Sequence, residues 1–288
     1  MSTAPESEEL FFESDGIRLH AVAAGPRLAP LILLLHGFPE FWYGWRKQIG
    51  PLAAAGYRVI APDQRGYNLS DKPLEVSDYA VPRLARDVLS IADQLGCERF
   101  HIAGHDWGAV IAWNVALQYP QRLHKLAIIN VPHPSALARA LETDPRQCLR
   151  SWYALFFQLP WLPEVAFSAF NFWLGTRALR LSSRPGTFTA EDLARHRAAW
   201  SQPGAMTATI NWYRAVARHR PTITDPRVRT PTLILWGKHD MFLLPTLAQD
   251  SLQYCDSARL TYFPDATHWV QHEEPEKVNQ SLLQFFQS

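Results

Sequence analysis

The chain has 288 residues with an ordinary hydrophobic fraction of 47%, which suffices for one large α/β domain or for a domain that carries an insertion. Its 28 basic and 27 acidic residues leave a formal net charge of +1 and no long basic run, so we expect no nucleic-acid partner. The longest apolar run, Leu31–Leu35, is too short to cross a bilayer, so we expect no membrane partner.

The first half of the chain predicts short strands that alternate with helices. Two strand-like runs, Leu10–Glu13 and Ile17–Ala23, flank a hairpin turn at Asp15-Gly16. The further predicted strands are Leu31–Leu35, Arg58–Ala61, Phe100–Ala103 and Leu123–Ile129, and the predicted helices are Gln48–Ala55, Val81–Leu95 and Ala109–Tyr119. Such alternation indicates a mostly parallel sheet flanked by helices, with ligands bound beyond the carboxyl ends of the strands.

The alternation breaks between about Pro132 and Asp225. This stretch has a helical pattern rich in arginine and aromatic residues, is interrupted by several prolines and contains no convincing buried strand. After it, Thr232–Trp236 and Arg259–Phe263 predict two more strands, and Pro275–Phe286 predicts a closing helix. We therefore predict a core domain of residues 1–131 and 226–288, with residues 132–225 inserted as a helical cap.

The stretch Gly104–Gly108 lies between a predicted strand and a predicted helix. Its pattern, Gly-x-Asp-x-Gly, has the form of a nucleophile elbow, in which small residues two before and two after the central one permit a turn too tight for side chains. The hydrolase version has serine at the centre, whereas this chain has Asp106. A carboxylate there attacks carbon and forms an alkyl ester, so we predict Asp106 as the nucleophile and a substrate with a breakable carbon–heteroatom bond.

Removal of that ester requires a base that activates water and an acid that orients the base. In the elbow-type order both residues follow the nucleophile in sequence, each beyond a later strand. Asp240 follows the strand Thr232–Trp236 and His268 follows the strand Arg259–Phe263. We therefore predict His268 as the general base and Asp240 as the acid that orients it.

Two other positions compete with Asp240 for the role of the acid. Asp265 lies three residues before His268 and is the main rival. The position after the strand Leu123–Ile129 is another possible site, but it carries Asn130, which cannot ionise.

The carbonyl oxygen of the ester gains negative charge during hydrolysis and needs backbone N–H donors, which together form an oxyanion hole. One donor is expected from Trp107, the residue after the nucleophile. We expect the second from Phe38, in the loop His36–Pro39 that follows the strand Leu31–Leu35.

Three stretches of the chain together resemble the soluble epoxide hydrolase-like members of the α/β-hydrolase fold: His36–Arg46, Gly104–Gly108 and Thr267–Trp269. The similarity extends over nearly the whole chain from about Leu10. The resemblance implies two cap tyrosines that hydrogen-bond the epoxide oxygen and protonate it as the ring opens. The matching motifs, Ser151–Gln158 and Asn211–Arg214, give Tyr153 and Tyr213 as these proton donors. Ring opening needs such a donor because an alkoxide is a strongly basic leaving group.

The sequence thus predicts an epoxide hydrolase that forms a vicinal diol through an aspartyl ester, with no metal or organic cofactor. Its partners are a small hydrophobic epoxide and water. A haloalkane or haloacid dehalogenase with the same aspartate nucleophile is an alternative, although a leaving halide needs N–H donors and no proton. A non-catalytic hydrolase-fold protein that binds a small ligand is a second alternative, although no predicted catalytic residue is missing. The physiological epoxide, the regio- and enantioselectivity and the oligomeric state stay open.

Two further expectations concern location and the cap. The three cysteines, Cys97, Cys148 and Cys255, lie outside any C-x-x-C spacing, and Met1–Glu9 lacks the pattern of a signal peptide, so we expect reduced thiols and a cytoplasmic protein. The cap stretch Trp152–Trp173 is rich in aromatic residues. We expect some of them to form the core of the cap and others to line an apolar tunnel to Asp106.

Overall fold

An eight-stranded sheet runs through the protein, whose computed structural model describes residues 7–219 and 222–288. The strands are β1 (Glu8–Ser14), β2 (Ile17–Ala24), β3 (Leu31–Leu35), β4 (Arg58–Pro62), β5 (Phe100–His105), β6 (Leu123–Ile129), β7 (Thr232–Gly237) and β8 (Ala258–Phe263). Their order is β1-β2-β4-β3-β5-β6-β7-β8. The β1–β2 and β2–β4 pairs are antiparallel and all other neighbouring pairs are parallel, which confirms the predicted mostly parallel sheet.

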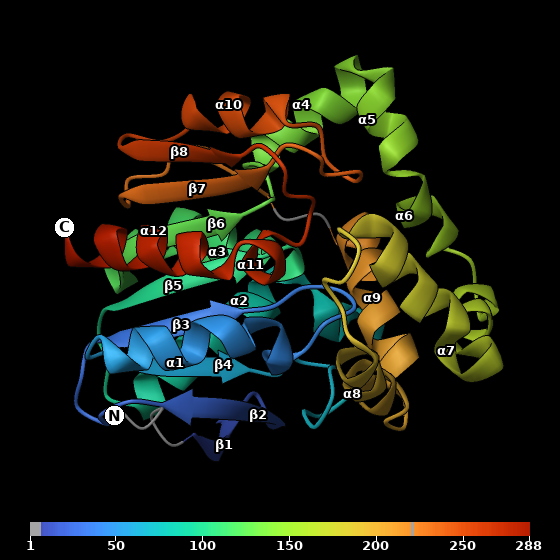
Figure 1. Cartoon of the computed structure of the whole chain (residues 1–288), viewed down its shortest axis with the longest axis horizontal. Helices are drawn as coiled ribbons and strands as arrows, with labels where there is room; N and C mark the ends of the chain where they lie inside the picture. The colour runs from blue at the N-terminus through green and yellow to red at the C-terminus, as the bar shows by residue number, and fades with distance from the viewer. Residues whose placement is uncertain (1–6, 220–221) are drawn as a thin grey trace.

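Helices cover both faces of the sheet (Figure 1). One face carries α1 (Arg46–Ala54), α11 (Val270–Glu273) and α12 (Pro275–Gln287), and the other carries α2 (Val81–Gln94), α3 (Trp107–Gln118) and α10 (Thr246–Leu252). Three short 3₁₀ helices, Trp42–Trp45, Val76–Tyr79 and Pro120–Arg122, lie in the connections. The sequence did not indicate α10 and α11, because helices of seven and four residues are too short to display a repeating apolar face.

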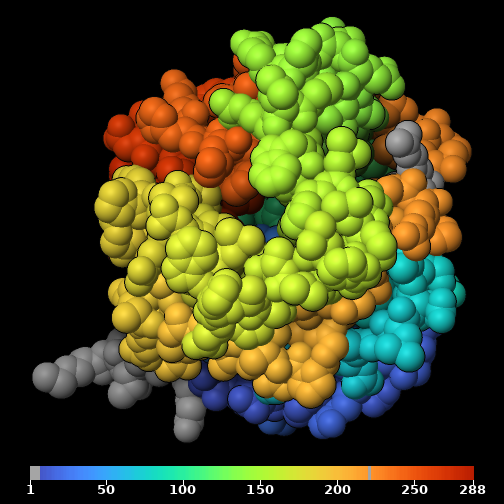
Figure 2. Space-filling view, turned by 90° about the vertical axis from the view of Figure 1, so that its right-hand side faces the viewer, coloured from blue at the N-terminus to red at the C-terminus, as the bar shows by residue number. Residues whose placement is uncertain are grey.

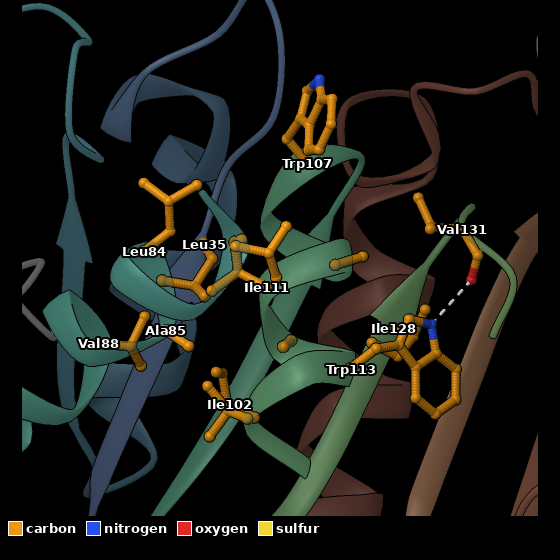
Figure 3. Packing of buried hydrophobic residues seen from close by; sticks show 14 of the residues in the cluster. Leu35, Leu84, Ala85, Val88, Ile102, Trp107, Ile111, Trp113, Ile128 and Val131 are labelled. Carbon is orange, nitrogen blue, oxygen red and sulfur yellow. Dashed lines mark hydrogen bonds between the residues drawn. The ribbon is translucent and has the colours of Figure 1, made fainter. Parts of the chain in front are cut away.

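Strand β3 illustrates why the core has two halves. All five of its residues are buried, as expected of a central strand covered on both faces. Because successive side chains of a strand point to opposite faces, Leu33 and Leu35 pack with α2 and α3, whereas Ile32 and Leu34 pack with α1 and α12. Figure 3 shows the first of these layers, in which the indole N–H of Trp113 also donates to the carbonyl oxygen of Val131 at 3.3 Å.

A group of six helices lies between β6 and β7, beyond the carboxyl ends of the parallel strands (Figure 1). They are α4 (Pro134–Thr143), α5 (Pro145–Arg150), α6 (Trp152–Phe156), α7 (Leu162–Ser182), α8 (Ala190–Trp200) and α9 (Ala205–Arg218). Three prolines of this stretch, Pro134, Pro145 and Pro163, occupy first-turn positions of helices, which need no N–H donor, and Pro160, Pro185 and Pro203 lie between helices. Residues 132–219 contain no strand.

Polar bonds fasten these helices to the rest of the molecule. The indole N–H groups of Trp200 and Trp212 donate to the carbonyl oxygens of Pro39 and Arg65, at 2.6 and 3.0 Å. Arg46 of α1 forms an ion pair with Asp192 of α8 at 2.9 Å. The helical layer therefore has a fixed position over the strand ends.

Two further observations complete the description of the chain. No helix formed by the described residues combines the length and the apolar character that a membrane crossing requires. Cys97, Cys148 and Cys255 form no disulfide.

Candidate active site

Asp106 lies on a tight turn between β5 and α3. Its backbone angles, φ 50° and ψ −124°, fall in a sparsely populated region for a residue with a side chain. A Cβ atom at Gly104 would lie 2.5 Å from the carbonyl oxygen of Gly108, and one at Gly108 would lie 2.1 Å from that of Leu35. The turn therefore requires glycine on both sides of Asp106, as the elbow pattern predicts.

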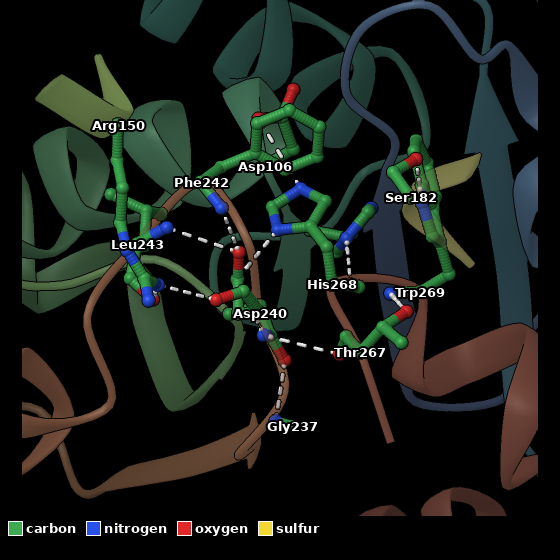
Figure 4. A network of polar contacts seen from close by, with 12 residues as sticks. Asp106, Arg150, Ser182, Gly237, Asp240, Phe242, Leu243, Thr267, His268 and Trp269 are labelled. Atoms are coloured by element: carbon green, nitrogen blue, oxygen red, sulfur yellow. Dashed lines mark hydrogen bonds and ion pairs between the residues drawn. The ribbon is translucent and has the colours of Figure 1, made fainter. Parts of the chain in front are cut away.

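The structure brings Asp106, Asp240 and His268 together at the carboxyl ends of β5, β7 and β8 (Figure 4). His268 Nδ1 lies 2.7 Å from Asp240 Oδ2, and His268 Nε2 lies 3.6 Å from Asp106 Oδ2. The imidazole thus has a carboxylate on each side. Asp265, the rival for the acid, is exposed.

The two carboxylates govern the protonation of His268. Burial lowers the pKa of this imidazole, but Asp240 and Asp106 outweigh burial and raise the pKa to about 10. Burial likewise raises the pKa of Asp106, but the hydrogen bond and charge of His268, with the N–H of Phe38, bring that pKa below its ordinary value. The resting site therefore favours an imidazolium between two carboxylates.

Asp240 is held by a set of hydrogen bonds that fixes its orientation. Its Oδ1 accepts from the backbone N–H groups of Phe242 and Leu243, at 2.7 and 3.0 Å. The Asn130 amide nitrogen donates to Oδ2 at 2.7 Å, and the Asn130 amide oxygen accepts from the N–H of Gly237 at 2.9 Å. The sequence analysis considered Asn130 only as a position for the acid, and its role as a support of Asp240 was missed. The available signal was its place directly after β6, at the same edge as the three predicted residues.

Phe38 provides the predicted backbone contact to the nucleophile. Its N–H donates to Asp106 Oδ1 at 2.7 Å. The approach is close, since a Cβ atom at Gly37 would lie 2.3 Å from Asp106 Oδ1. Trp107, the other predicted donor, is the first residue of α3, where backbone N–H groups have no partner within the helix.

Tyr153 of α6 and Tyr213 of α9 lie next to each other, with ring centroids 6.0 Å apart and ring planes at 80°. Tyr213 packs edge-on against Phe38 and Trp107, at centroid distances of 5.5 and 4.9 Å, which connects it to both sides of Asp106. Burial, followed by the charge of Asp106, raises the pKa of both phenols. Both tyrosines therefore keep their protons and lie within the electrostatic field of Asp106.

A buried polar cluster adjoins the site on the side of His105. Glu40 Oε1 lies 2.6 Å from His272 Nε2, and Glu40 Oε2 lies 3.4 Å from His105 Nδ1. Burial raises the pKa of the Glu40 carboxyl, but the charge of His272 and the histidine hydrogen bonds hold it well below its usual range. The other ring nitrogen of His105 lies 2.9 Å from the carbonyl oxygen of His268. The cluster thus supports the backbone of His268. Within residues 7–219 and 222–288, no three His, Cys, Asp or Glu side chains are arranged to hold a metal ion.

The cap aromatic residues divide differently from the expectation. Phe157 and Phe167 are buried and pack against Phe38, with ring centroids 5.4 and 5.6 Å from its ring. Trp161 and Phe170, however, are 68% and 90% exposed, so they belong neither to a core nor to a tunnel wall. Buried Phe157 and Phe167 agree with the expected core, and the exposed Trp161 and Phe170 form a further group that the sequence did not indicate, because the period of a helix does not tell which face has a neighbour.

Comparisons with known proteins agree with the geometry. The family described as alpha/beta hydrolase fold matches residues 30–275. The chain is 44% identical to the AB hydrolase superfamily protein YfhM of Bacillus subtilis, over 96% of this chain and 97% of that protein. It is 40% identical to human epoxide hydrolase 4, over 95% of this chain and 76% of that protein. The crystal structure of a Bacillus megaterium epoxide hydrolase in complex with an inhibitor superposes with a TM-score of 0.89 at 29% identity, covering 97% of this chain and 100% of that one.

Proposed function

Since the chain belongs to the epoxide hydrolases of the α/β-hydrolase fold, we propose that Asp106, His268 and Asp240 convert an epoxide to a vicinal diol through an ester on Asp106. The observation that carries this assignment of roles is the imidazole of His268, held between two carboxylates, one of which lies on the strained turn. A carboxylate on such a turn is exposed to a reactant, and the side chain of Asp106 retains 19% exposure.

In the first step, an oxygen of Asp106 attacks an epoxide carbon. Because Oδ1 accepts a hydrogen bond from the N–H of Phe38, we assign Oδ2 as the oxygen that attacks. A bond forms between Oδ2 and carbon while the carbon–oxygen bond of the epoxide breaks. The released oxygen takes a proton from Tyr153 or Tyr213, whose raised pKa values keep both phenols protonated before the reaction.

In the second step, water cleaves the ester. Esterification removes the negative charge of Asp106, and with it one of the two influences that raise the pKa of His268. Loss of this charge favours the neutral imidazole, and the proton that the imidazolium releases restores the tyrosine that was deprotonated in the first step. The neutral imidazole then takes a proton from water as the water adds to the carboxyl carbon of Asp106. Oδ1 then carries the negative charge and is stabilised by the N–H groups of Phe38 and Trp107. Collapse breaks the bond between the carboxyl carbon and Oδ2, and Oδ2 leaves as a diol oxygen that takes the proton from His268. The carboxylic acid left on Asp106 then gives its proton to His268, which restores the resting ion pair.

We also propose the division of labour between the two parts of the chain. Residues 1–131 and 226–288 carry the nucleophile, base and acid, and residues 132–225 form a cap that carries the two tyrosines. The packing of Phe38 against Phe157 and Phe167 supports a hydrophobic epoxide as the substrate, because these apolar rings adjoin the N–H that binds Asp106.

Replacement of the base tests the proposal directly. The variant His268→Gln should still open an epoxide but should fail to hydrolyse the ester. Intact-protein mass spectrometry should then find a mass increase equal to that of the epoxide, located on Asp106 by peptide mapping. The exposed neighbour of Asp240 gives a matched control, since His239→Gln should turn over normally and accumulate no adduct.

Two results would contradict the proposal. The first is a folded His268→Gln protein that forms no covalent adduct with any epoxide of an aryl and alkyl panel. The other is release of halide from a haloalkane panel by the wild type without diol formation from epoxides, which would instead indicate a dehalogenase.

A further inference from the structure

The outer surface of α5, α6 and α7 exposes large apolar side chains. We define the cap patch as Leu149, Trp152, Leu155, Trp161, Phe170 and Trp173. Their exposed fractions range from 54% for Trp173 to 90% for Phe170. Single exposed apolar residues are ordinary, but six within residues 149–173, three of them tryptophans, indicate an interaction surface. Figure 2 shows the face on which these helices lie.

The cap patch carries no uncompensated charge. Glu164 is the only Asp, Glu, Lys or Arg residue between residues 151 and 176. Its two carboxylate oxygens accept from Arg214 at 2.6 and 3.1 Å, so its charge is neutralised on the inner side of the cap. The surface between Arg150 and Arg177 therefore carries no unpaired charge and consists mainly of apolar side chains.

The border of the cap patch is cationic. Residues 139–184 contain six arginines and three carboxylates. Arg177 and Arg180 are exposed, and neither has a carboxylate within 4.0 Å among the residues that the structure describes. The Arg177 guanidinium lies 5.3 Å from the ring centroid of Trp173, so charge and aromatic surface are directly adjacent. An anionic partner fits this border.

The backbone of α7 holds Phe170 outward. Residues Phe170, Asn171 and Phe172 have φ values of 51°, 56° and 59°, which interrupt the helix with a left-handed turn. This turn leaves Phe170 90% exposed while Phe172 is buried in the cap. Left-handed conformations are costly for residues with side chains, and their presence here maintains an outward-pointing phenylalanine.

We propose that the cap patch binds the surface of an anionic phospholipid membrane. Tryptophan, phenylalanine and leucine side chains enter the boundary between headgroups and acyl chains, and Arg177 and Arg180 pair with lipid phosphates. The prediction of no membrane partner rests on the length of the longest apolar run. This criterion does not detect the cap patch, because the residues of the patch are separated in sequence and are brought together by folding.

A second copy of the chain fits this face less well than a membrane. A two-fold dimer would bring each cationic border against an identical one. Figure 2 also shows a hollow among the cap helices, at the bottom of which blue and teal atoms of the core are visible. A copy seated on this face would cover the hollow. If the proposed function holds, a lipid surface there would instead supply hydrophobic epoxides to the side of the molecule on which Asp106 lies.

Vesicle flotation of the full chain tests the proposal, using phosphatidylcholine vesicles and vesicles of equal parts phosphatidylcholine and phosphatidylglycerol. The wild type should float with the mixed vesicles at low salt and should dissociate as salt is added. Trp161→Ser combined with Phe170→Ser should lower the partition coefficient about tenfold or more. The double variant Leu28→Ser and Leu74→Ser, at positions 101% and 90% exposed outside the cap patch, should bind like the wild type.

The charge requirement has its own pair of variants. Arg177→Gln and Arg180→Gln should each lower partitioning about fivefold, as expected for about 1 kcal/mol per arginine near an anionic surface. Arg259→Gln, an exposed arginine on β8, should have little effect. Binding is measured without substrate, so it is independent of epoxide turnover. Absence of flotation with both vesicle types overturns the proposal, as does a wild-type dimer that the Trp161→Ser and Phe170→Ser changes dissociate while vesicle binding is absent.

Discussion

Asn130 connects the acid of the site to the strand beside it. Its amide donates to Asp240 and accepts from Gly237, and its φ of 50° is one that glycine adopts without strain. Asn130→Gly therefore removes both hydrogen bonds with little backbone cost. A hydrogen bond to a charged group is worth roughly 1.5–3 kcal/mol, so breakdown of the ester should slow about tenfold or more in single-turnover experiments.

A matched asparagine supports a different aspartate, one that does not contact His268. Asn68 also has a positive φ, 40°, and also donates to an aspartate, Asp63, at 2.8 Å. Asn68→Gly should leave ester breakdown within about twofold of the wild type. Equal slowing in both variants would mean that general destabilisation, and not the support of Asp240, explains the effect.

The two cap tyrosines supply a second prediction at the scale of single residues. Tyr153→Phe and Tyr213→Phe should each slow epoxide turnover by roughly tenfold to a hundredfold, because each removes one acid for the leaving oxygen. The double variant should be nearly inactive in a diol-formation assay. Tyr57→Phe, which packs against His101 and Phe286 on another side of the sheet, is the control. A double variant with a normal rate removes the tyrosines from the mechanism.

The raised pKa of His268 predicts how stability depends on pH. A histidine whose folded pKa lies above its unfolded value stabilises the fold fully below the unfolded pKa, near 6.5, and this contribution is lost as the pH rises through about 10. The difference in unfolding free energy between wild type and His268→Gln should therefore be largest near pH 6 and should decline toward pH 10. Urea titrations across this range measure it. The His239→Gln variant should show no such decline, and a flat difference for His268→Gln would contradict the ion-paired state.

At the scale of elements, the turn between β5 and α3 leaves no space for side chains. Gly104→Ala places a methyl group 2.5 Å from a backbone oxygen that cannot move without displacing α3, so it should destabilise the fold by about 3 kcal/mol and reduce activity. Gly50→Ala is the matched change, because no atom outside its chain neighbours and its own helix backbone lies within 4 Å of its Cβ position. That variant should be neutral or gain up to about 1 kcal/mol in urea unfolding.

The elements also show how far sequence reasoning extends. Leu31–Leu35 and Leu123–Ile129 were predicted with their observed limits, because the first is apolar throughout and the second ends in the apolar run Leu126–Ile129. The sequence brought Asp106, Asp240 and His268 together as candidates because each lies within five residues after the end of a strand, and the structure places the three side chains side by side. Asn130 and Glu40 were not assigned roles, since their partners lie 110 and 232 residues away and only the fold brings them together. The exposed side of α7 could not be predicted either, because a left-handed turn at Phe170–Phe172 interrupts the helix and changes which side chains face outward.

For the whole molecule, the hydrogen bonds that attach the cap helices to the core are expected to control how readily these helices open separately from the sheet. Trp200 and Trp212 anchor α8 and α9 to the carbonyl oxygens of Pro39 and Arg65. Trp200→Phe removes the five-membered ring of a buried indole and leaves the carbonyl of Pro39 without its donor, at a cost of at least about 1–2 kcal/mol. Hydrogen exchange should rise in residues 184–218 more than in the sheet. Trp152→Phe, an exposed tryptophan, should leave exchange unchanged. Uniform exchange across the chain would mean that the cap and sheet open as one unit.

The ring cluster around Asp106 has a practical consequence. Trp107 follows the nucleophile directly and packs edge-on against Trp212 and Tyr213, at centroid distances of 5.7 and 4.9 Å. Loss of the Asp106 charge on ester formation changes the electric field at these indoles, and transfer of a proton from Tyr213 changes it again. Intrinsic fluorescence in a stopped-flow instrument should therefore resolve ester formation and ester hydrolysis as separate phases. The rates of both steps can then be compared between epoxides that give no coloured product.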